Sequence, residues 1–232
     1  MEGFADAHLH LADPGIGKGY PDLSGASLLF ACSAGEGEWP ALRSIRDSRA
    51  VKFYGVHPWF ADGYSEPALR RVLASDPSAQ VGEIGLDRVR GFDVPQMMAF
   101  ESQMSLAEEF GRCANVHCVR CENEVLGTLR MFRPRSTILH SFVGPAACVS
   151  VLSDLGCYFS VSPRIIMMSE DRARGVVRTI PEDRLLVETD APNNYGICTS
   201  MGDFLARLGP LLDMGPREVA RLTARNARRA IG

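Results

Sequence analysis

The sequence predicts an α/β protein that folds as one (β/α)8 TIM barrel with parallel strands. Eight apolar runs alternate with helical segments along the 232 residues, which is typical of parallel strands joined by helical crossovers. Polar residues stand at or beside the carboxyl ends of six of these runs. An open sheet would spread those ends along a wide front, whereas a closed barrel gathers them at one rim. These polar residues are His8, His10, His57, Glu83, His117, His140 and Asp190.

The expected elements follow from apolar periodicity and from the positions of glycine and proline. Residues 12–26 are dense in proline and glycine, so we expect a loop in place of the first crossover helix. An irregular stretch is expected before the last helix, and residues 1–232 are expected to form one domain. The expected strands are 4–10, 27–33, 51–58, 80–86, 115–119, 137–142, 157–162 and 184–190, and the expected helices are 38–49, 66–75, 95–112, 122–131, 146–154, 169–179 and 216–230.

Composition excludes several classes of protein. The net charge of −3 argues against a non-specific nucleic-acid coat protein, although it leaves room for a local patch of arginines. The chain has no apolar run of about 18 residues and no signal-peptide pattern at its start, which predicts a cytoplasmic protein without membrane association. Seven scattered cysteines do not form a disulfide framework. We expect a monomer with no obligate protein partner.

The first strand carries a candidate metal site. Side chains alternate between the two faces of a strand, so Asp6, His8 and His10 share one face. Two imidazoles presented side by side are suited to hold a divalent cation. An alternative is that they are ordinary polar residues on an exposed strand. Since all five histidines of the chain fall at predicted strand ends and none in a helix, the metal interpretation is favoured.

Carboxylates complete the candidate site. Glu83 stands between two glycines that allow close approach, and Asp190 ends an otherwise apolar strand, where a carboxylate is costly to bury without a cation. For Asp87 and Glu188, an ordinary role as hydrogen-bonded or salt-bridged acids is a more plausible alternative than it is for Glu83 and Asp190. Six candidate ligands are too many for one tetrahedral site and suit two ions. Many two-metal barrel hydrolases bridge their ions with a carboxylated lysine, but the only lysines here, Lys18 and Lys52, do not lie at strand ends. Glu83 is therefore the predicted bridge. The predicted ligands are His8, His10 and Asp190 for one ion, His117 and His140 for the other, and Glu83 for both.

The sequence resembles the TatD family of metal-dependent hydrolases, which are related to the amidohydrolase barrels. The resemblance covers nearly the whole chain and depends on several motifs in the family's order. These are Asp6-Ala-His-Leu-His10, Gly55-Val-His-Pro58, Gly82-Glu-Ile-Gly-Leu-Asp87, a helix with Gln96, Phe100, Gln103 and Ala107, His117, His140-Ser-Phe-Val-Gly144, the segment Ile180 to Pro192, and Asn226.

The resemblance implies a TIM barrel that hydrolyses phosphodiesters, typically as a 3′-to-5′ deoxyribonuclease, with its metal positions at the six ligands above. It implies that His57 lies near the substrate phosphate. The chain departs from the family pattern at Val119, where an arginine is common, and at Arg88-Val-Arg90, where aromatic residues are common. These departures affect the rim and therefore the substrate. A small ester, an amide or an aminoacyl ester is an alternative substrate, and a metal-binding protein that only interacts with a partner is a non-enzymatic alternative.

The expected mechanism uses two divalent ions, which could be zinc, manganese, magnesium or nickel, to activate a water molecule for attack on phosphorus. Asp190 is the candidate general base, and Glu83 is the bridging ligand. His57 with Arg88, Arg120 or Arg164 would position the phosphate, since the planar guanidinium of arginine matches phosphate oxygens. Arg90 is a further candidate for this role.

Overall fold

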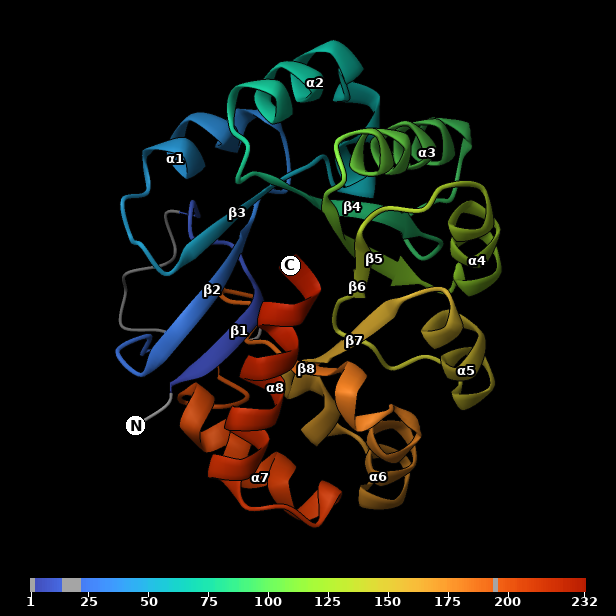
Figure 1. Ribbon diagram of the computed structural model, residues 1–232. Coiled ribbons are helices and arrows are strands. Elements are labelled where there is room, and N and C mark those ends of the chain that lie inside the picture. The colour runs from blue at the N-terminus through green and yellow to red at the C-terminus, as the bar shows by residue number, and fades with distance from the viewer. Residues whose placement is uncertain (1–2, 14–21, 194–195) are drawn as a thin grey trace.

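Eight parallel strands form one sheet in the order of the sequence. The computed structural model describes residues 3–13, 22–193 and 196–232. Each strand pairs in parallel with the next one along the chain, and the strands curve around a common axis (Figure 1). The predicted barrel is therefore confirmed. Its strands are β1 (Phe4–Leu9), β2 (Ala26–Cys32), β3 (Ala50–Tyr54), β4 (Gln80–Asp87), β5 (Cys113–Val119), β6 (Ser136–Leu139), β7 (Cys157–Val161) and β8 (Leu185–Val187).

The barrel closes where β1 meets the chain that leaves β8. The backbone N–H of Asp190 donates to the carbonyl of His8 at 3.0 Å, and that of His10 donates to the carbonyl of Ala191 at 2.9 Å. The buried carboxylate of Asp6 accepts hydrogen bonds from the N–H and the hydroxyl of Thr189 at 2.9 and 2.6 Å. These bonds place the first and last predicted ligand segments side by side.

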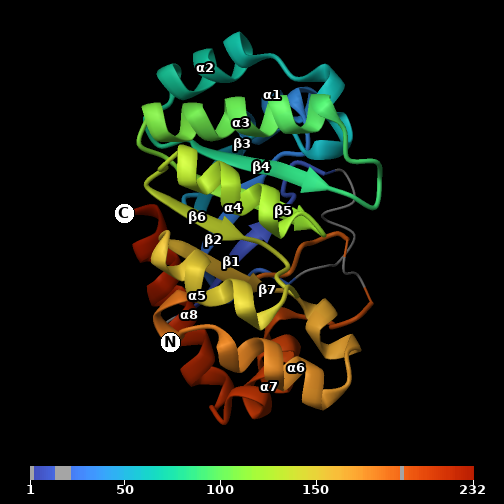
Figure 2. The same cartoon turned by 90° about the vertical axis from the view of Figure 1, so that its right-hand side faces the viewer.

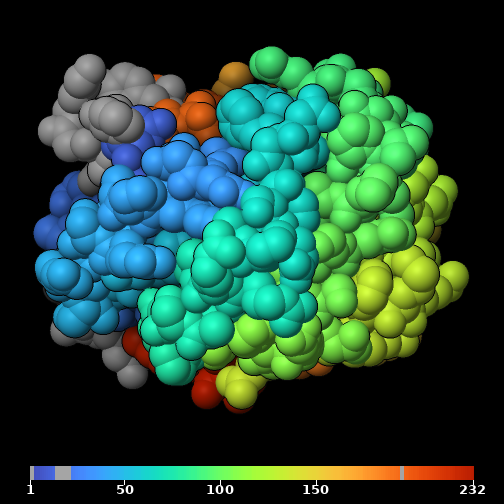
Figure 3. Space-filling view, turned by 90° about the horizontal axis from the view of Figure 1, so that it is seen from above, coloured from blue at the N-terminus to red at the C-terminus, as the bar shows by residue number. Residues whose placement is uncertain are grey.

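Helices and short 3-10 turns cover the outside of the barrel (Figure 1). In the side view the arrows of β4 and β5 point to one side, and α8 lies at the opposite side (Figure 2). The space-filling view shows the early crossovers as adjacent blue, teal and green bands of the outer wall (Figure 3). The helices are α1 (Trp39–Ser44), α2 (Glu66–Ser75), α3 (Val94–Glu109), α4 (Glu122–Met131), α5 (Ala146–Asp154), α6 (Glu170–Thr179), α7 (Met201–Leu212) and α8 (Pro216–Ile231), with 3-10 turns η1 (Glu36–Glu38), η2 (Pro58–Gly63), η3 (Pro163–Met167) and η4 (Glu182–Arg184).

Helix α8 closes the end of the barrel opposite the strand tips. Its buried alanines, including Ala224 and Ala227, pack in one apolar cluster with Phe30 and Phe53. Small side chains let the helix approach the barrel closely, which buries apolar surface on both partners. Asn226, also fully buried, donates from its side-chain amide to the carbonyls of Glu182 and Leu185. The helix is thereby fixed to the start of β8.

The structure corrects some element boundaries. The stretch expected to be irregular contains α7, which begins at the N-cap Ser200, whose hydroxyl accepts a hydrogen bond from the N–H of Asp203. Gly202, Gly209 and Pro210 lower the helix propensity of this segment, although its buried Met201, Phe204, Leu205 and Leu208 recur at helical spacing. The helix expected over 38–49 is shorter, and several strands end earlier than expected because the chain turns into rim loops. In the expected loop 12–26, residues 14–21 lie outside the described residues, and 12–13 and 22–25 contain no helix or strand.

Within the described chain, no helix has the length and apolar character needed to cross a bilayer.

Candidate metal centre

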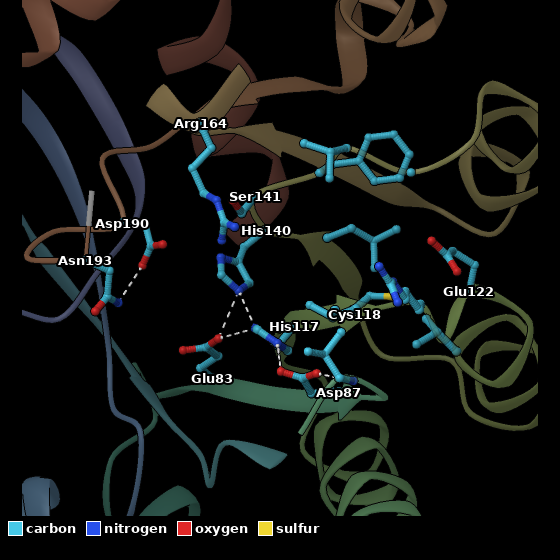
Figure 4. Close-up of a pocket in the computed structure, with 18 of the residues that line it drawn as sticks. Glu83, Asp87, His117, Cys118, Glu122, His140, Ser141, Arg164, Asp190 and Asn193 are labelled. Atoms are coloured by element: carbon cyan, nitrogen blue, oxygen red, sulfur yellow. Dashed lines mark hydrogen bonds and ion pairs between the residues drawn. The ribbon is translucent and has the colours of Figure 1, made fainter. Parts of the chain in front are cut away.

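Glu83 lies at the middle of a cluster that contains all five histidines. Its Oε1 is 3.0 Å from Nδ1 of His117 and 2.9 Å from Nε2 of His140, and its Oε2 is 3.5 Å from Nε2 of His8 and 3.4 Å from Nε2 of His10. Oδ1 of Asp190 is 4.0 and 3.9 Å from the same two nitrogens of His8 and His10. The two oxygens of Glu83 therefore face two different histidine pairs, and the close-up shows the contacts of Glu83 with His117 and His140 (Figure 4). The structure brings all six predicted ligands together.

Three of these imidazoles are held through the ring nitrogen that faces away from Glu83. Nδ1 of His8 is 2.9 Å from Oδ1 of Asn115, and the amide nitrogen of Asn115 donates to the carbonyl of Ala7. Because that donation fixes the amide orientation, Oδ1 accepts from His8 and leaves Nε2 of His8 with a lone pair. Outer hydrogen bonds of this kind orient metal-binding histidines in proteins.

Carboxylates hold the other two rings. Oδ2 of Asp87 is 3.3 Å from Nε2 of His117, and Oε1 of Glu188 is 3.3 Å from Nδ1 of His140. In the neutral form the proton of each ring lies on the carboxylate side, so the nitrogens of His117 and His140 that face Glu83 are the ones whose lone pairs could bind a cation. Asp87 and Glu188 thus occupy the structural roles that the sequence left open for them.

Close backbone packing of β4 on β5 places Glu83 beside His117. Gly85 pairs with His117 and has φ of +138°, a conformation that residues with a side chain rarely adopt. A Cβ at Gly85 would collide with the carbonyl oxygen of His117. Gly85 is one of the two glycines expected to allow close approach near Glu83, and it allows the neighbouring strand β5 to approach β4.

Helix α3 fixes the two rim segments that follow β3 and β4. The side-chain amide of Gln103 exchanges two hydrogen bonds with the backbone of Val56, at 2.8 and 3.1 Å. Gln96 accepts from the N–H of Asp87 at 3.0 Å and donates to the carbonyl of Gly91 at 2.8 Å. Both glutamines are buried, so these bonds hold the chain next to His57 and at Asp87 in one position.

His57 differs from the other histidines in its hydrogen bonding. Nδ1 of His57 accepts from the N–H of Trp59 at 3.1 Å, so in the neutral ring the proton is on Nε2. Nε2 lies 3.4 Å from Oε1 of Glu83. Burial, together with the neighbouring His117, His140 and His10, outweighs Glu83 and lowers the pKa of His57 to about 3. His57 is therefore a neutral hydrogen-bond donor at the edge of the cluster.

The electrostatics of the cluster suit a cation. Burial and His8 act to lower the pKa of His140, but Glu83 and Glu188 outweigh them and raise it to about 9. Burial acts to raise the pKa of Glu83, but the surrounding histidines hold it well below its usual value. A buried carboxylate thus draws positive charge onto the adjacent rings, and a divalent ion would satisfy the same field while displacing those protons.

The donor set fits divalent metal ions. Nε2 of His8 and Nε2 of His10 are 3.3 Å apart, close to the spacing of two nitrogens around tetrahedral zinc at about 2.0–2.1 Å. Such a contact between ring nitrogens requires a proton or a cation between them. Among the described residues, three groups have ligand atoms within 4.8 Å of one another, namely His8, Glu83 and His140; His8, His10 and Asp190; and His57, Glu83 and His117.

A cleft of about 1610 Å³ opens above the cluster and contains candidate substrate-binding residues. Arg120 and Arg164 both line it, and the side chain of Arg164 extends toward His140 (Figure 4). Arg90 also lines the cleft. Arg88 instead donates to Glu124 at 2.5 Å and to the carbonyl of Arg120 at 3.0 Å, which directs its guanidinium to α4.

Two residues near the centre escaped the sequence reasoning. Asn115 precedes His117 by two positions on the same strand, and that spacing could have identified it as a neighbour on one face. The amide of Asn193 donates to Oδ1 of Asp190 at 3.0 Å, and no strand periodicity predicts this turn contact. Asp190 itself has φ of +51°, the left-handed conformation of a tight turn.

The fold and the donor set define an α/β barrel with a divalent-metal centre at the carboxyl ends of its strands. The sequence model of the family described as "TatD related DNase" matches residues 5–232, and the chain belongs to this family. As a member it falls in the hydrolase class, so the predicted resemblance is confirmed.

Relatives agree with this membership. An uncharacterized metal-dependent hydrolase TatD of Mycobacterium tuberculosis is 31% identical over 213 residues, which cover 84% of this chain and 81% of that protein. The 3′-5′ ssDNA/RNA exonuclease TatD of Edwardsiella piscicida is 35% identical over 148 residues, which cover 60% of this chain and 56% of that enzyme. The match therefore spans little more than half of the exonuclease.

Solved structures share the fold. The TatD homologue YjjV of Escherichia coli superposes with a TM-score of 0.82 at 21% identity, over 98% of this chain and 97% of that one. A TatD family hydrolase of Entamoeba histolytica superposes with a TM-score of 0.80 at 17% identity, over 99% and 98% of the two chains.

Proposed function

We propose that this protein is a divalent-metal-dependent phosphodiesterase that removes nucleotides from the 3′ end of single-stranded nucleic acid, and that residues 1–232 act as one catalytic domain. The observation that carries the proposal is the division of Glu83 between two histidine pairs. The exonuclease activity named for the Edwardsiella relative supports the choice of substrate. Cytoplasmic location and a monomeric state stay predictions from the sequence.

The cluster would hold two divalent ions. His8, His10 and Asp190 form one set of ligands, His117 and His140 form the other, and Glu83 belongs to both. Divalent ions in such a centre acidify water and offset negative charge on phosphoryl oxygens. Zinc, manganese, magnesium and nickel all suit the mixed set of imidazoles and carboxylates.

The residues around the ions have separate roles in this proposal. Asp190 lies at the edge of the cluster and would accept the proton of the attacking water as general base. His57 has its proton on Nε2 and would donate it in a hydrogen bond to a non-bridging phosphate oxygen. Arg164 and Arg120 line the cleft and would pair with phosphates of the strand. For Arg88 to contact substrate, its bond to Glu124 would have to break.

A hydrolysis assay tests the proposal. Metal-stripped protein is incubated with a 5′-labelled single-stranded DNA oligonucleotide and with Mg²⁺, Mn²⁺ or Zn²⁺ in turn. We expect a ladder shortened from the 3′ end in at least one metal, and no cleavage with chelator alone. A panel of p-nitrophenyl esters under the same conditions separates phosphodiester hydrolysis from carboxylic ester hydrolysis.

Glu83→Ala gives the decisive variant. Loss of the shared ligand should abolish cleavage, whereas Glu109→Ala, a change at an exposed glutamate paired with Arg70, should leave it intact. Unchanged phosphodiester cleavage in Glu83→Ala would eliminate the bridging role.

A further inference from the structure

Two aromatic side chains stand exposed at the rim of the cleft. Trp59 is 47% exposed and Phe60 is 53% exposed, and both line the cleft above the metal centre. The other tryptophan, Trp39, is only 7% exposed. Large rings are normally buried in a fold of this size, so a pair of them at the mouth of a functional cleft indicates a binding surface.

The Trp59 ring is fixed to the catalytic cluster. Nε1 of Trp59 donates to Oδ2 of Asp87 at 2.7 Å, the same oxygen that lies 3.3 Å from His117. The rings of Trp59 and Phe60 have centroids 4.7 and 6.3 Å from that of His57. The aromatic pair is therefore held beside the histidine that we assign to the phosphate.

An arginine adds charge and a further flat group. Cζ of Arg90 lies 4.1 Å from the centroid of the Trp59 ring, a cation–π contact. A guanidinium and aromatic rings beside a phosphate site are the groups on which the bases of single-stranded nucleic acids stack. A nucleobase is joined to its own phosphate by one sugar, so it would reach these rings when the phosphate is at His57.

We propose that Trp59, Phe60 and Arg90 form a stacking site for the base that adjoins the scissile phosphate of a single-stranded nucleic acid. This inference rests on the proposed function and specifies how the substrate is held. A base enters the site only when it is unpaired, so the site would also favour single strands over duplexes. Stacking does not read base edges, so all four bases would be accepted.

Phe60→Ala is the variant that tests the stacking site, because Phe60 is half exposed and its hydrogen bond to the carbonyl of His57 comes from the backbone N–H, which the substitution keeps. Met131→Ala is the matched control, since Met131 is 56% exposed on α4 and is not part of the cleft lining. The probe is a thymidine decamer with a 5′ fluorescein, used intact or with an abasic unit at one of its three 3′-terminal positions. Binding is measured by anisotropy in chelator, and hydrolysis is measured with Mn²⁺.

We expect Phe60→Ala to bind the intact decamer about tenfold more weakly than wild type, and Met131→Ala to bind it equally well. At one position, the abasic unit should weaken binding to wild type about tenfold and have little further effect on Phe60→Ala. Phe60→Tyr, which keeps the ring, should restore the affinity.

The outcomes separate this inference from the proposed function. The stacking site would be overturned if the abasic unit weakened binding by the same factor in wild type and Phe60→Ala at all three positions, even when wild type cleaves the decamer. Absence of cleavage by wild type in every metal overturns the proposed function instead, and the binding data then decide the stacking site independently.

Discussion

Glu188 and His140 come from different strand ends and meet in the interior of the barrel. Oε1 of Glu188 is 3.3 Å from Nδ1 of His140 and also accepts the N–H of Ser141 at 2.7 Å. Glu188 is fully buried, so its negative charge acts on the ring with little screening by water. The carboxylate orients the ring and increases the basicity of its other nitrogen, which faces Glu83.

Replacing Glu188 should therefore weaken metal binding. Glu188→Gln keeps the shape of the side chain but removes its charge, and we expect roughly 10- to 100-fold lower affinity for Zn²⁺ or Mn²⁺. Competition with a fluorescent chelator measures the affinity. Glu109→Gln, on the surface, serves as control and should match wild type. An unchanged affinity in Glu188→Gln would show that this carboxylate does not support a metal ligand.

Adding metal should stabilise the stripped protein. An ion present at 100 times its Kd contributes about 2.7 kcal/mol to the free energy of unfolding. For a chain of this length that corresponds to a rise in Tm of roughly 5–10 °C. Differential scanning fluorimetry measures the rise, and Glu83→Gln should lose most of it. A Glu83→Gln protein that gains as much as wild type would contradict the shared-ligand arrangement.

Gly85→Ala should destabilise the barrel. The new Cβ meets the carbonyl of His117 at a backbone φ of +138°, so both strain and overpacking apply. We expect a loss of about 3 kcal/mol or more in urea unfolding. Gly127→Ala is the matched control, because a Cβ there meets no atom within 4 Å and the residue lies inside α4. That change should stabilise the protein by about 0.5–1 kcal/mol. Equal effects of the two substitutions would contradict this account of the close packing of β4 on β5.

Asn226→Leu should destabilise the packing of α8 on the end of the barrel that it closes, without changing the metal centre. It removes the donor that the carbonyls of Glu182 and Leu185 share, and the buried carbonyl of Leu185 then costs about 1–3 kcal/mol, whereas water can reach the part-buried carbonyl of Glu182. Urea unfolding measures this cost, and Asn123→Ala at an exposed position should change stability by less than about 0.5 kcal/mol. Metal affinity should match that of wild type, and a large loss would show that α8 also supports the centre.

Alanine substitutions of the rim arginines should weaken nucleic-acid binding to different extents. Arg164→Ala and Arg120→Ala should each weaken oligonucleotide binding. Each should also reduce the steepness of the plot of log binding constant against log salt concentration by about one, the value for one phosphate contact. Arg88→Ala should have the smaller effect, because Glu124 already pairs with its guanidinium. Anisotropy titrations at several salt concentrations measure these slopes. A larger change in slope for Arg88→Ala would place the strand over α4 instead of across the cleft.

The sequence predicted most of the fold because the apolar periods and turn residues agree locally with the barrel. It did not predict α7, where Gly202, Gly209 and Pro210 have low helix propensity although Met201, Phe204, Leu205 and Leu208 are spaced as on one face of a helix. The packing of α7 on its neighbours overrides these weak local preferences, since tertiary burial contributes more than intrinsic propensity. The early ends of β6 and β8 could not be predicted either, because the same residues suit a strand or an extended rim loop.

Sequence alone determined the ligand types and the strand ends that carry them, because side-chain alternation and the βα repeat depend only on local spacing. Only the tertiary structure decided which ring nitrogen of His8, His117 and His140 faces Glu83. That choice depends on Asn115, Asp87 and Glu188, which approach from strands distant in the chain. The exposure of Trp59 and Phe60 was likewise decided by the path of the rim after β3, which no periodicity encodes.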